Sequence, residues 1–260
     1  MLMGKKPDQL IQSIDRAFDI LELLVEKGSS MGVTEISERT KLHKSTVYRL
    51  LATLRYRGYV KKDNHEKYKI GFKLFELGSS VINNIDLRSD AKPFLRELMN
   101  ISEETVHLGV LDDNQVVYID KVESENTIRM YSKIGRRNHA SSTSLGKVIL
   151  AYSDREVVDK VIREEGLKKL TENTITDEEQ FKKHLAKVRS QGYAIDNEEQ
   201  EYGIRCIAGP IFDHTGEVIA AFSISGPTMR MTKEKVESLK PVIKEYSKKI
   251  SESFGCNGFC

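Results

Sequence analysis

The chain has 260 residues, of which 39% are hydrophobic and 31% are charged, and its formal net charge is +2 at pH 7. This length is enough for two domains that each bury a core. No apolar run approaches the ~20 residues of a membrane span, and the N-terminus lacks the apolar segment of a signal peptide. We therefore expect a cytoplasmic protein without membrane contact, and its 3 cysteines fit a reducing compartment.

Residues 10–28 predict a helix that supports the elements after it. Ser13 is expected to cap this helix and Gly28 to end it. Its apolar residues keep helical spacing, and we expect them to face the core: Ile14, Ala17, Phe18, Leu21, Leu24 and Val25.

Residues 34–58 predict two short helices joined by a tight turn. Thr34 is expected to cap the first helix, Ile36 to point inward, and residues 41–43 to form the turn. In the second helix, apolar residues fall at i, i+3, i+4 and i+7, which makes one stripe: Val47, Leu50, Leu51 and Leu54. The other face carries side chains that can bond phosphates and base edges. We predict that this helix contacts DNA through Lys44, Ser45, Thr46, Tyr48, Arg49, Thr53 and Arg55.

The charge of this region supports the prediction. Between Arg39 and Lys62 there are eight basic residues and no acidic ones, on a chain that is nearly neutral. A local basic field of this kind indicates a polyanionic partner. The alternative is a solvated basic helix pair in an ordinary helical subdomain. We favour DNA binding because the turn, the apolar stripe and the acid-free face agree.

Two β-prone runs, 59–62 and 67–70, follow directly and flank an Asp63-Asn64 turn signal. A hairpin after a recognition helix predicts a winged helix-turn-helix. Its basic side chains are expected to contact the DNA backbone: Lys61, Lys62 and Lys67. We assign residues 10–72 to this DNA-binding domain.

Residues 73–88 predict a linker helix from Lys73 to Leu87, because apolar side chains keep helical spacing at Leu74, Leu77, Val81 and Ile85. Residues 89–256 form the second predicted domain. It begins with a helix over 89–101 and ends with one over 233–254. Between them we expect strands at 105–111, 116–122, 127–132, 204–212 and 218–225, and helices at 145–152, 154–165 and 178–191. This order predicts an α+β domain with a largely antiparallel sheet.

One group of residues in the second domain suggests a binding site. Residues 144–147 precede a predicted helix, whose free N–H groups and positive dipole end would attract an anion. Ser223 and Ser225 could help to hold a carboxylate, and Asp196 could accept hydrogen bonds from ligand hydroxyls. The alternative is that both serines alternate on one strand face and Cys206 is a small core residue. A nucleophilic Cys206 would need a base and a lowered pKa, and no His lies near it in the sequence.

The histidines are scattered without metal-ligand spacing, so we predict no metal and no cofactor. Cys256 and Cys260 stand in a Gly-containing tail. A metal site there is the weaker interpretation, because no His and no further Cys is near.

Several runs of the sequence resemble the IclR family of bacterial transcription regulators, and the resemblance covers residues 10–254. The runs are 44–49 (KSTVYR), 74–78 (LFELG), 129–132 (RMYS), 134–138 (IGRRN), 196–201 (DNEEQE), 205–208 (RCIA) and 223–225 (SIS). The resemblance implies a winged helix-turn-helix joined by a linker helix to a GAF-like α/β effector-binding domain. It also implies an effector pocket formed by Met130, Ser144, Leu145, Gly146, Asp196, Ile204, Cys206, Ser223 and Ser225. Many members carry a His where this chain has Ser141, which argues against a metal in the pocket.

The resemblance further implies a repressor that binds double-stranded operator DNA as a homodimer or a dimer of dimers. It implies an effector that is a small sugar-derived keto acid of the 2-keto-3-deoxygluconate type. The alternative is an enzyme or sensor that converts a small acid and binds nucleic acid incidentally. We favour a regulator and not an enzyme, because apart from Asp196 no general base stands near Cys206 or the serines in the sequence.

Overall fold

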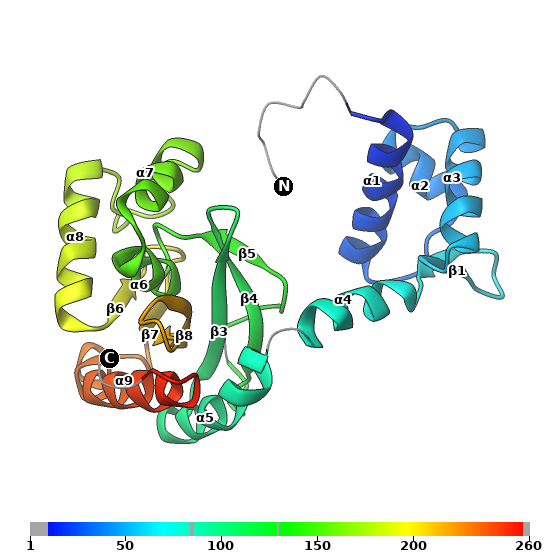
Figure 1. Ribbon diagram of the computed structural model, residues 1–260. Coiled ribbons are helices and arrows are strands. Elements are labelled where there is room, and N and C mark those ends of the chain that lie inside the picture. Colours follow the sequence, from blue (N-terminus) through cyan, green and yellow to red (C-terminus); the bar gives the residue numbers. More distant parts are fainter. Residues whose placement is uncertain (1–9, 84–85, 129, 257–260) are drawn as a thin grey trace. The chain divides into compact units, whose positions relative to one another are not determined.

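The computed structural model describes residues 10–83, 86–128 and 130–256 (Figure 1). The chain divides into two compact units, Met1–Ile85 and Asp86–Cys260. No helix in the described part of the chain combines the length and the apolar character that a bilayer crossing requires.

The first unit is a winged helix-turn-helix, as predicted. Its elements are α1 (Gln12–Lys27), α2 (Val33–Thr40), α3 (Lys44–Tyr56), β1 (Val60–Lys62), β2 (Tyr68–Ile70) and α4 (Lys73–Asn83). The two strands pair antiparallel, with Val60 opposite Ile70. Met31 adds a bridge to Tyr68, which ties the wing to the segment before α2. Side chains from α1, α2, α3, the hairpin and the segment before α2 share one core: Ile20, Leu21, Leu23, Leu24, Met31, Ile36, Val47, Leu51, Leu54, Val60 and Tyr68.

Two predicted helix caps are wrong. Ser13 lies inside α1, whose N-cap is Ile11, and Thr34 lies inside α2, whose N-cap is Gly32. Neither cap residue accepts a side-chain hydrogen bond, so these helices begin without the side-chain signal that the sequence prediction used. The predicted end of α1 is confirmed: Gly28 has φ 66°, and its N–H donates to the Leu24 carbonyl.

The outward face of α1 is more apolar than expected. Leu21 and Leu24 are buried as predicted. The prediction is wrong for Ile14, Phe18 and Val25, whose exposed fractions are 51%, 58% and 59%. The helix is apolar on two sides but packs within its unit on one. Its exposed apolar residues form an outer stripe, which we define as Ile11, Ile14, Phe18 and Val25.

The predicted linker helix falls on two described helices. α4 spans Lys73–Asn83, and α5 (Asp86–Ser102) begins before Leu87, which is buried in the second unit. Leu74 packs against the core of the first unit, whereas Leu77 is exposed. Ile85 falls outside the described residues, as does any account of the Val81 side chain.

The second unit is built on a six-stranded sheet with the order β5-β4-β3-β8-β7-β6. Every neighbouring pair is antiparallel, which confirms the predicted α+β class. The strands are β3 (Thr105–Asp112), β4 (Gln115–Val122), β5 (Arg137–His139), β6 (Ala194–Asn197), β7 (Ile204–Phe212) and β8 (Val218–Pro227). The helices after α5 are α6 (Ser144–Tyr152), α7 (Arg155–Glu164), α8 (Glu178–Gln191) and α9 (Lys233–Ser253).

One predicted strand is wrong. Residues 127–132 contain no strand among the described positions, and the edge of the sheet is instead β5. The apparent alternation in this run does not reflect a buried face, since both Ile128 and Tyr131 are exposed. The short strand β6 was not predicted either.

Helices cover both faces of the sheet (Figure 1). α5 packs on β3 and β4 and α9 packs on β7, while α6 packs on the opposite face against β7 and β8. Close approach depends on glycine at Gly209, where an added Cβ would lie 2.8 Å from the Ile243 Cγ2 atom of α9. The sheet is therefore buried on both sides.

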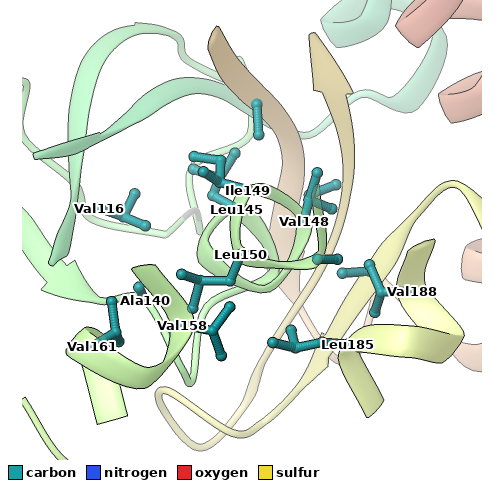
Figure 2. Packing of buried hydrophobic residues seen from close by; sticks show 14 of the residues in the cluster. Val116, Ala140, Leu145, Val148, Ile149, Leu150, Val158, Val161, Leu185 and Val188 are labelled. Carbon is teal, nitrogen blue, oxygen red and sulfur yellow. The ribbon is translucent and has the colours of Figure 1, made fainter. Parts of the chain in front are cut away.

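α6 lies at the centre of the second core. Figure 2 shows its residues Leu145, Val148, Ile149 and Leu150 among side chains of β4, α7 and α8. Every residue from Ser144 to Ala151 is buried. The helix is therefore enclosed almost all round and packs against β7 and β8.

Candidate functional site

The exposed face of α3 is the candidate nucleic-acid interface. The apolar stripe is inward, as predicted: Val47, Leu51 and Leu54 are buried, and Leu50 is half-buried. The predicted contact residues lie on the other side. Thr46 is half-buried, and the exposed ones are Lys44, Ser45, Tyr48, Arg49, Thr53 and Arg55. The Thr53 hydroxyl donates to the Arg49 carbonyl at 3.1 Å, so it remains available to a partner only as an acceptor.

The wing presents two of its three predicted lysines freely to solvent. Lys61 and Lys67 are exposed, whereas Lys62 is half-buried and forms an ion pair with Glu66. The Asp63 Oδ1 atom accepts the N–H groups of His65 at 2.9 Å and Lys67 at 3.0 Å, which fixes the tip. Lys62 therefore contributes less positive charge to the wing than the sequence suggested.

A pocket in the second unit collects residues from four strands, the N-terminus of α6 and two loops. Its lining consists of Tyr118, Met130, Thr143, Ser144, Leu145, Asp196, Gln200, Glu201, Ile204, Cys206, Ser223 and Ser225. The cavity between these residues has a volume of about 10 Å³. Eight of the nine residues proposed from the sequence line it, all except Gly146.

The register of the sheet explains why residues far apart in the sequence meet here. Asp196 of β6 lies opposite Cys206 of β7, and Cys206 lies opposite Ser225 of β8. Directly opposed residues of antiparallel strands point to the same face, and so do residues two apart on one strand, which adds Ser223. The hydroxyls of Ser223 and Ser225 are 3.3 Å apart.

The N-terminus of α6 forms the opposite wall. Thr143 is its N-cap, and its Oγ1 atom accepts the Gly146 N–H at 3.2 Å. The N–H groups of Ser144 and Leu145 belong to the first turn, where a helix has no acceptor of its own for them. They make the pocket favourable for an anion, together with the positive end of the dipole. Gly146 serves packing instead, because an added Cβ would overlap the Ala140 backbone.

Asp196 is the buried carboxyl among the residues that line the pocket. Only 3% of it is exposed, and its Oδ1 atom accepts the N–H groups of Glu199 at 2.8 Å and Gln200 at 3.4 Å. Burial raises the pKa of Asp196 to about 7, with Glu199 adding to the increase and Lys147 opposing it. Near neutral pH this carboxyl is therefore divided between its protonated and ionised forms.

Cys206 does not have the properties of a nucleophile. It is buried, and burial raises the pKa of its thiol well above the ordinary value, so the thiolate is not populated near neutral pH. His107 is on β3, which β8 separates from the strand of Cys206. It bonds Ser132 through Nε2 at 2.8 Å, and burial lowers its pKa to about 3. These features favour a binding pocket over a catalytic site.

A buried ion pair lies behind the pocket. Lys147 of α6 is fully buried, and its Nζ atom donates to the Ile195 carbonyl at 2.6 Å and pairs with Glu199. Thr174 holds the same loop by donating to the Glu199 carbonyl at 2.7 Å. The pair was not predicted, although a single Lys in the otherwise apolar run SLGKVILAY signals a buried cation that needs an acidic partner.

Four residues of the lining were also not predicted individually: Tyr118, Thr143, Gln200 and Glu201. Thr143 carried a usable signal, because threonine directly before a helix is a preferred N-cap. Gln200 and Glu201 reach the pocket through the loop after β6, and the Ser142 hydroxyl bonds the Gln200 side chain. Their placement depends on tertiary contacts that periodicity does not report.

Comparisons with known proteins agree with this architecture. The family described as "IclR helix-turn-helix domain" matches residues 13–64, and "Bacterial transcriptional regulator IclR C-terminal" matches residues 79–252. The chain is 44% identical to the HTH-type transcriptional regulator KdgR of Escherichia coli, over 99% of this chain and 97% of that protein. It is 43% identical to the KdgR of Dickeya chrysanthemi, over 99% of this chain and 84% of that protein.

A solved structure of similar fold is the crystal structure of Thermotoga maritima IclR. It superposes with a TM-score of 0.82 at 38% identity, and the match covers 95% of this chain and all of that one. The family matches span the helix-turn-helix and the domain that carries the pocket. The chain therefore belongs to the IclR family of bacterial transcriptional regulators.

Proposed function

We propose that this regulator is a repressor whose operator binding is relieved by a small sugar-derived keto acid, most specifically 2-keto-3-deoxygluconate. The observation that carries the proposal is the pocket itself, where the N-terminus of α6 faces two serines and Asp196. The 34% identity to the transcriptional repressor IclR of Escherichia coli, over 94% of this chain, supports the repressor role. Such a protein acts in the cytoplasm, where its operator lies.

The chemistry of the pocket suits a ligand with one carboxylate and several hydroxyls. The N–H groups of Ser144 and Leu145 and the serine hydroxyls would hold the carboxylate. Asp196 and Gln200 would bond the hydroxyl end. Met130 and Ile204 supply apolar lining, so the ligand is enclosed by both kinds of surface.

The first prediction concerns DNA recognition by α3. Replacing Arg49 with Ala is expected to weaken binding to the operator by ~1 to 3 kcal/mol more than binding to random DNA, because an Arg bidentate to guanine reads sequence. The operator is found by footprinting upstream of the gene for this protein, and both affinities are measured by fluorescence anisotropy. Arg57→Ala removes the same charge outside α3 and is expected to lack this selectivity. An equal loss on both DNAs would show that Arg49 contacts only phosphate.

The second prediction concerns oligomeric state. One recognition helix reads too few base pairs, so we propose a homodimer that forms through the N-terminal and linker helices, or a dimer of two such dimers. The outer stripe of α1 is a suitable apolar surface, since Phe18 is 58% exposed. Sedimentation at micromolar concentration is expected to show no monomer, and Phe18→Asp to produce it. Tyr56→Asp, at an 88% exposed position, is the control. A species of ~30 kDa alone would exclude the dimer, because the chain has a mass of 29.6 kDa.

The third prediction tests the effector. Saturating 2-keto-3-deoxygluconate is expected to weaken operator binding at least about tenfold, which requires a ligand preference for the arrangement that does not bind DNA. We propose that α4 transmits this change. Asp196→Ala is expected to cost 2-keto-3-deoxygluconate ~1 to 3 kcal/mol in calorimetry and to affect pyruvate less, since pyruvate has no hydroxyl to lose a partner. Binding without any change in operator affinity would contradict the mechanism.

A further inference from the structure

The pocket has an unusual charge balance for a site that takes an acid. Among the described residues that line it, two are acidic, Asp196 and Glu201, and none is Lys or Arg. The cation that acts on Asp196 is the buried Lys147, which is already paired with Glu199 and bonded to the Ile195 carbonyl. No lining side chain is therefore available to neutralise a bound carboxylate.

The groups that face Asp196 come from several elements. Lys147 of α6 and Glu199 of the loop after β6 act on its carboxyl, which in turn acts on Cys206 of β7 and Tyr118 of β4. Tyr118 is also acted on by Glu201 and by the exposed Arg136, which is not part of the lining. Burial raises the pKa of both Cys206 and Tyr118, so these two are neutral near pH 7. His184 of α8, which interacts with Lys147, is also neutral, because burial lowers its pKa to about 4. Lys147 is the cation that favours the ionised form of Asp196, and its charge is already paired with Glu199.

A bound carboxylate would add a second negative charge to this enclosed space. The N-terminus of α6 supplies the equivalent of only about half a positive charge. Two carboxylates that share a buried site cannot both be ionised without a large cost, so one of them takes up a proton. The Oδ1 atom of Asp196 already accepts two backbone N–H groups, which leaves Oδ2 as the atom that can carry the proton.

We propose that the pocket takes up one proton together with each anionic ligand, and that Asp196 is the residue that holds it. This inference rests on the proposed function and specifies the ligand as an acid bound with a proton. The protonated carboxyl then donates a hydrogen bond from Oδ2 to a ligand oxygen at the hydroxyl end. Burial supports this, because it raises the pKa of Asp196 to about 7 and so lets the carboxyl take up a proton near neutral pH.

Calorimetry with 2-keto-3-deoxygluconate tests the proposal directly. Titrations at pH 8 in phosphate and in Tris, whose ionisation enthalpies differ, report the number of protons exchanged. We expect uptake of close to one proton per ligand and an affinity that falls about tenfold for each pH unit above 7. Since the ligand carboxylate is ionised throughout this range, the exchange reports the protein.

The variant Asp196→Asn removes the negative charge of the side chain but keeps its hydrogen bonds. Asn keeps an acceptor for the N–H groups of Glu199 and Gln200 and can donate like the protonated acid. We expect this variant to bind without proton uptake and with the same affinity at pH 6.5 and 8.5. Glu179→Gln, the matched change at an exposed carboxyl of α8 outside the pocket, is expected to retain the uptake of the wild type.

The outcomes distinguish this inference from the proposed function. Binding by the wild type without proton exchange would overturn the inference alone, as would unchanged uptake in Asp196→Asn. Absence of binding at every pH would overturn the proposed effector and this inference with it. The proton uptake measured for the wild type tests the inference even if a variant folds poorly.

Discussion

Replacing Lys147 with Met is expected to destabilise the second unit by ~3 to 5 kcal/mol, because it leaves the Glu199 carboxylate buried without its partner. Lys147 is fully buried and Glu199 is 6% exposed, so water cannot replace the lost ion pair. The Ile195 carbonyl loses its donor as well. Urea unfolding monitored by circular dichroism measures the change in the unfolding free energy of this unit.

Two further variants test whether the loss of stability comes from the buried ion pair. Lys183→Met breaks an exposed pair with Glu179, whose side chains are 74% and 78% exposed, and is expected to cost no more than ~0.5 kcal/mol. The double variant Lys147→Met/Glu199→Leu removes both charges and is expected to regain most of the loss, because an apolar pair of similar volume replaces the ion pair. A Lys147→Met protein as stable as Lys183→Met would show that the buried pair is not formed.

Replacing Gly146 with Ala is expected to destabilise the same unit by ~1 to 3 kcal/mol through overpacking. The added Cβ would overlap the Ala140 backbone, and neither that backbone nor the enclosed helix has room to move. The intrinsic gain of Ala over Gly in a helix, ~1 kcal/mol, is thereby reversed. The same unfolding experiment measures the effect. Loss of binding to 2-keto-3-deoxygluconate should accompany it, since Ser144 and Leu145 are displaced.

Gly78→Ala is the matched control for this substitution. Gly78 lies within α4, and an added Cβ there would meet no atom within 4 Å. We expect a stabilisation of the first unit by ~0.5 to 1 kcal/mol. If both substitutions stabilise the protein, the close approach of α6 to Ala140 is not a constraint.

The elements of the DNA-binding unit were largely predictable, because their signals are local. The stripe of α3 follows from helical spacing within the run Val47 to Leu54, and the hairpin follows from a turn signal between two short β-prone runs. α1 was correctly predicted as a helix, but the sequence did not predict which of its apolar faces is buried. Ile14 and Phe18 are as apolar as the residues that are buried, so spacing alone could not distinguish a core face from an outward one.

The lining of the pocket was likewise predictable only in part from the sequence. The resemblance to a family identified eight of its lining residues, and the residues themselves indicated an anion site at the start of α6. Spacing could not place Tyr118 or Glu201, which reach the pocket through the sheet and a loop. It also misplaced the strand at 127–132, because a short alternating run has no strand identity until a neighbouring strand pairs with it.

The sequence by itself determined the two-domain order, the helix-turn-helix, the class of the second domain and the residue types of an anion site. These properties depend on periodicity, turn chemistry and charge over short stretches of chain. Only the tertiary structure decided that Asp196, Cys206 and Ser225 stand in one row, since that depends on the register of three antiparallel strands. It also decided that Lys147 is paired with Glu199, so that the charge of Lys147 is not free to neutralise Asp196. The ionisation of a carboxyl depends on its burial and on its distance from other charges, and the local sequence specifies neither.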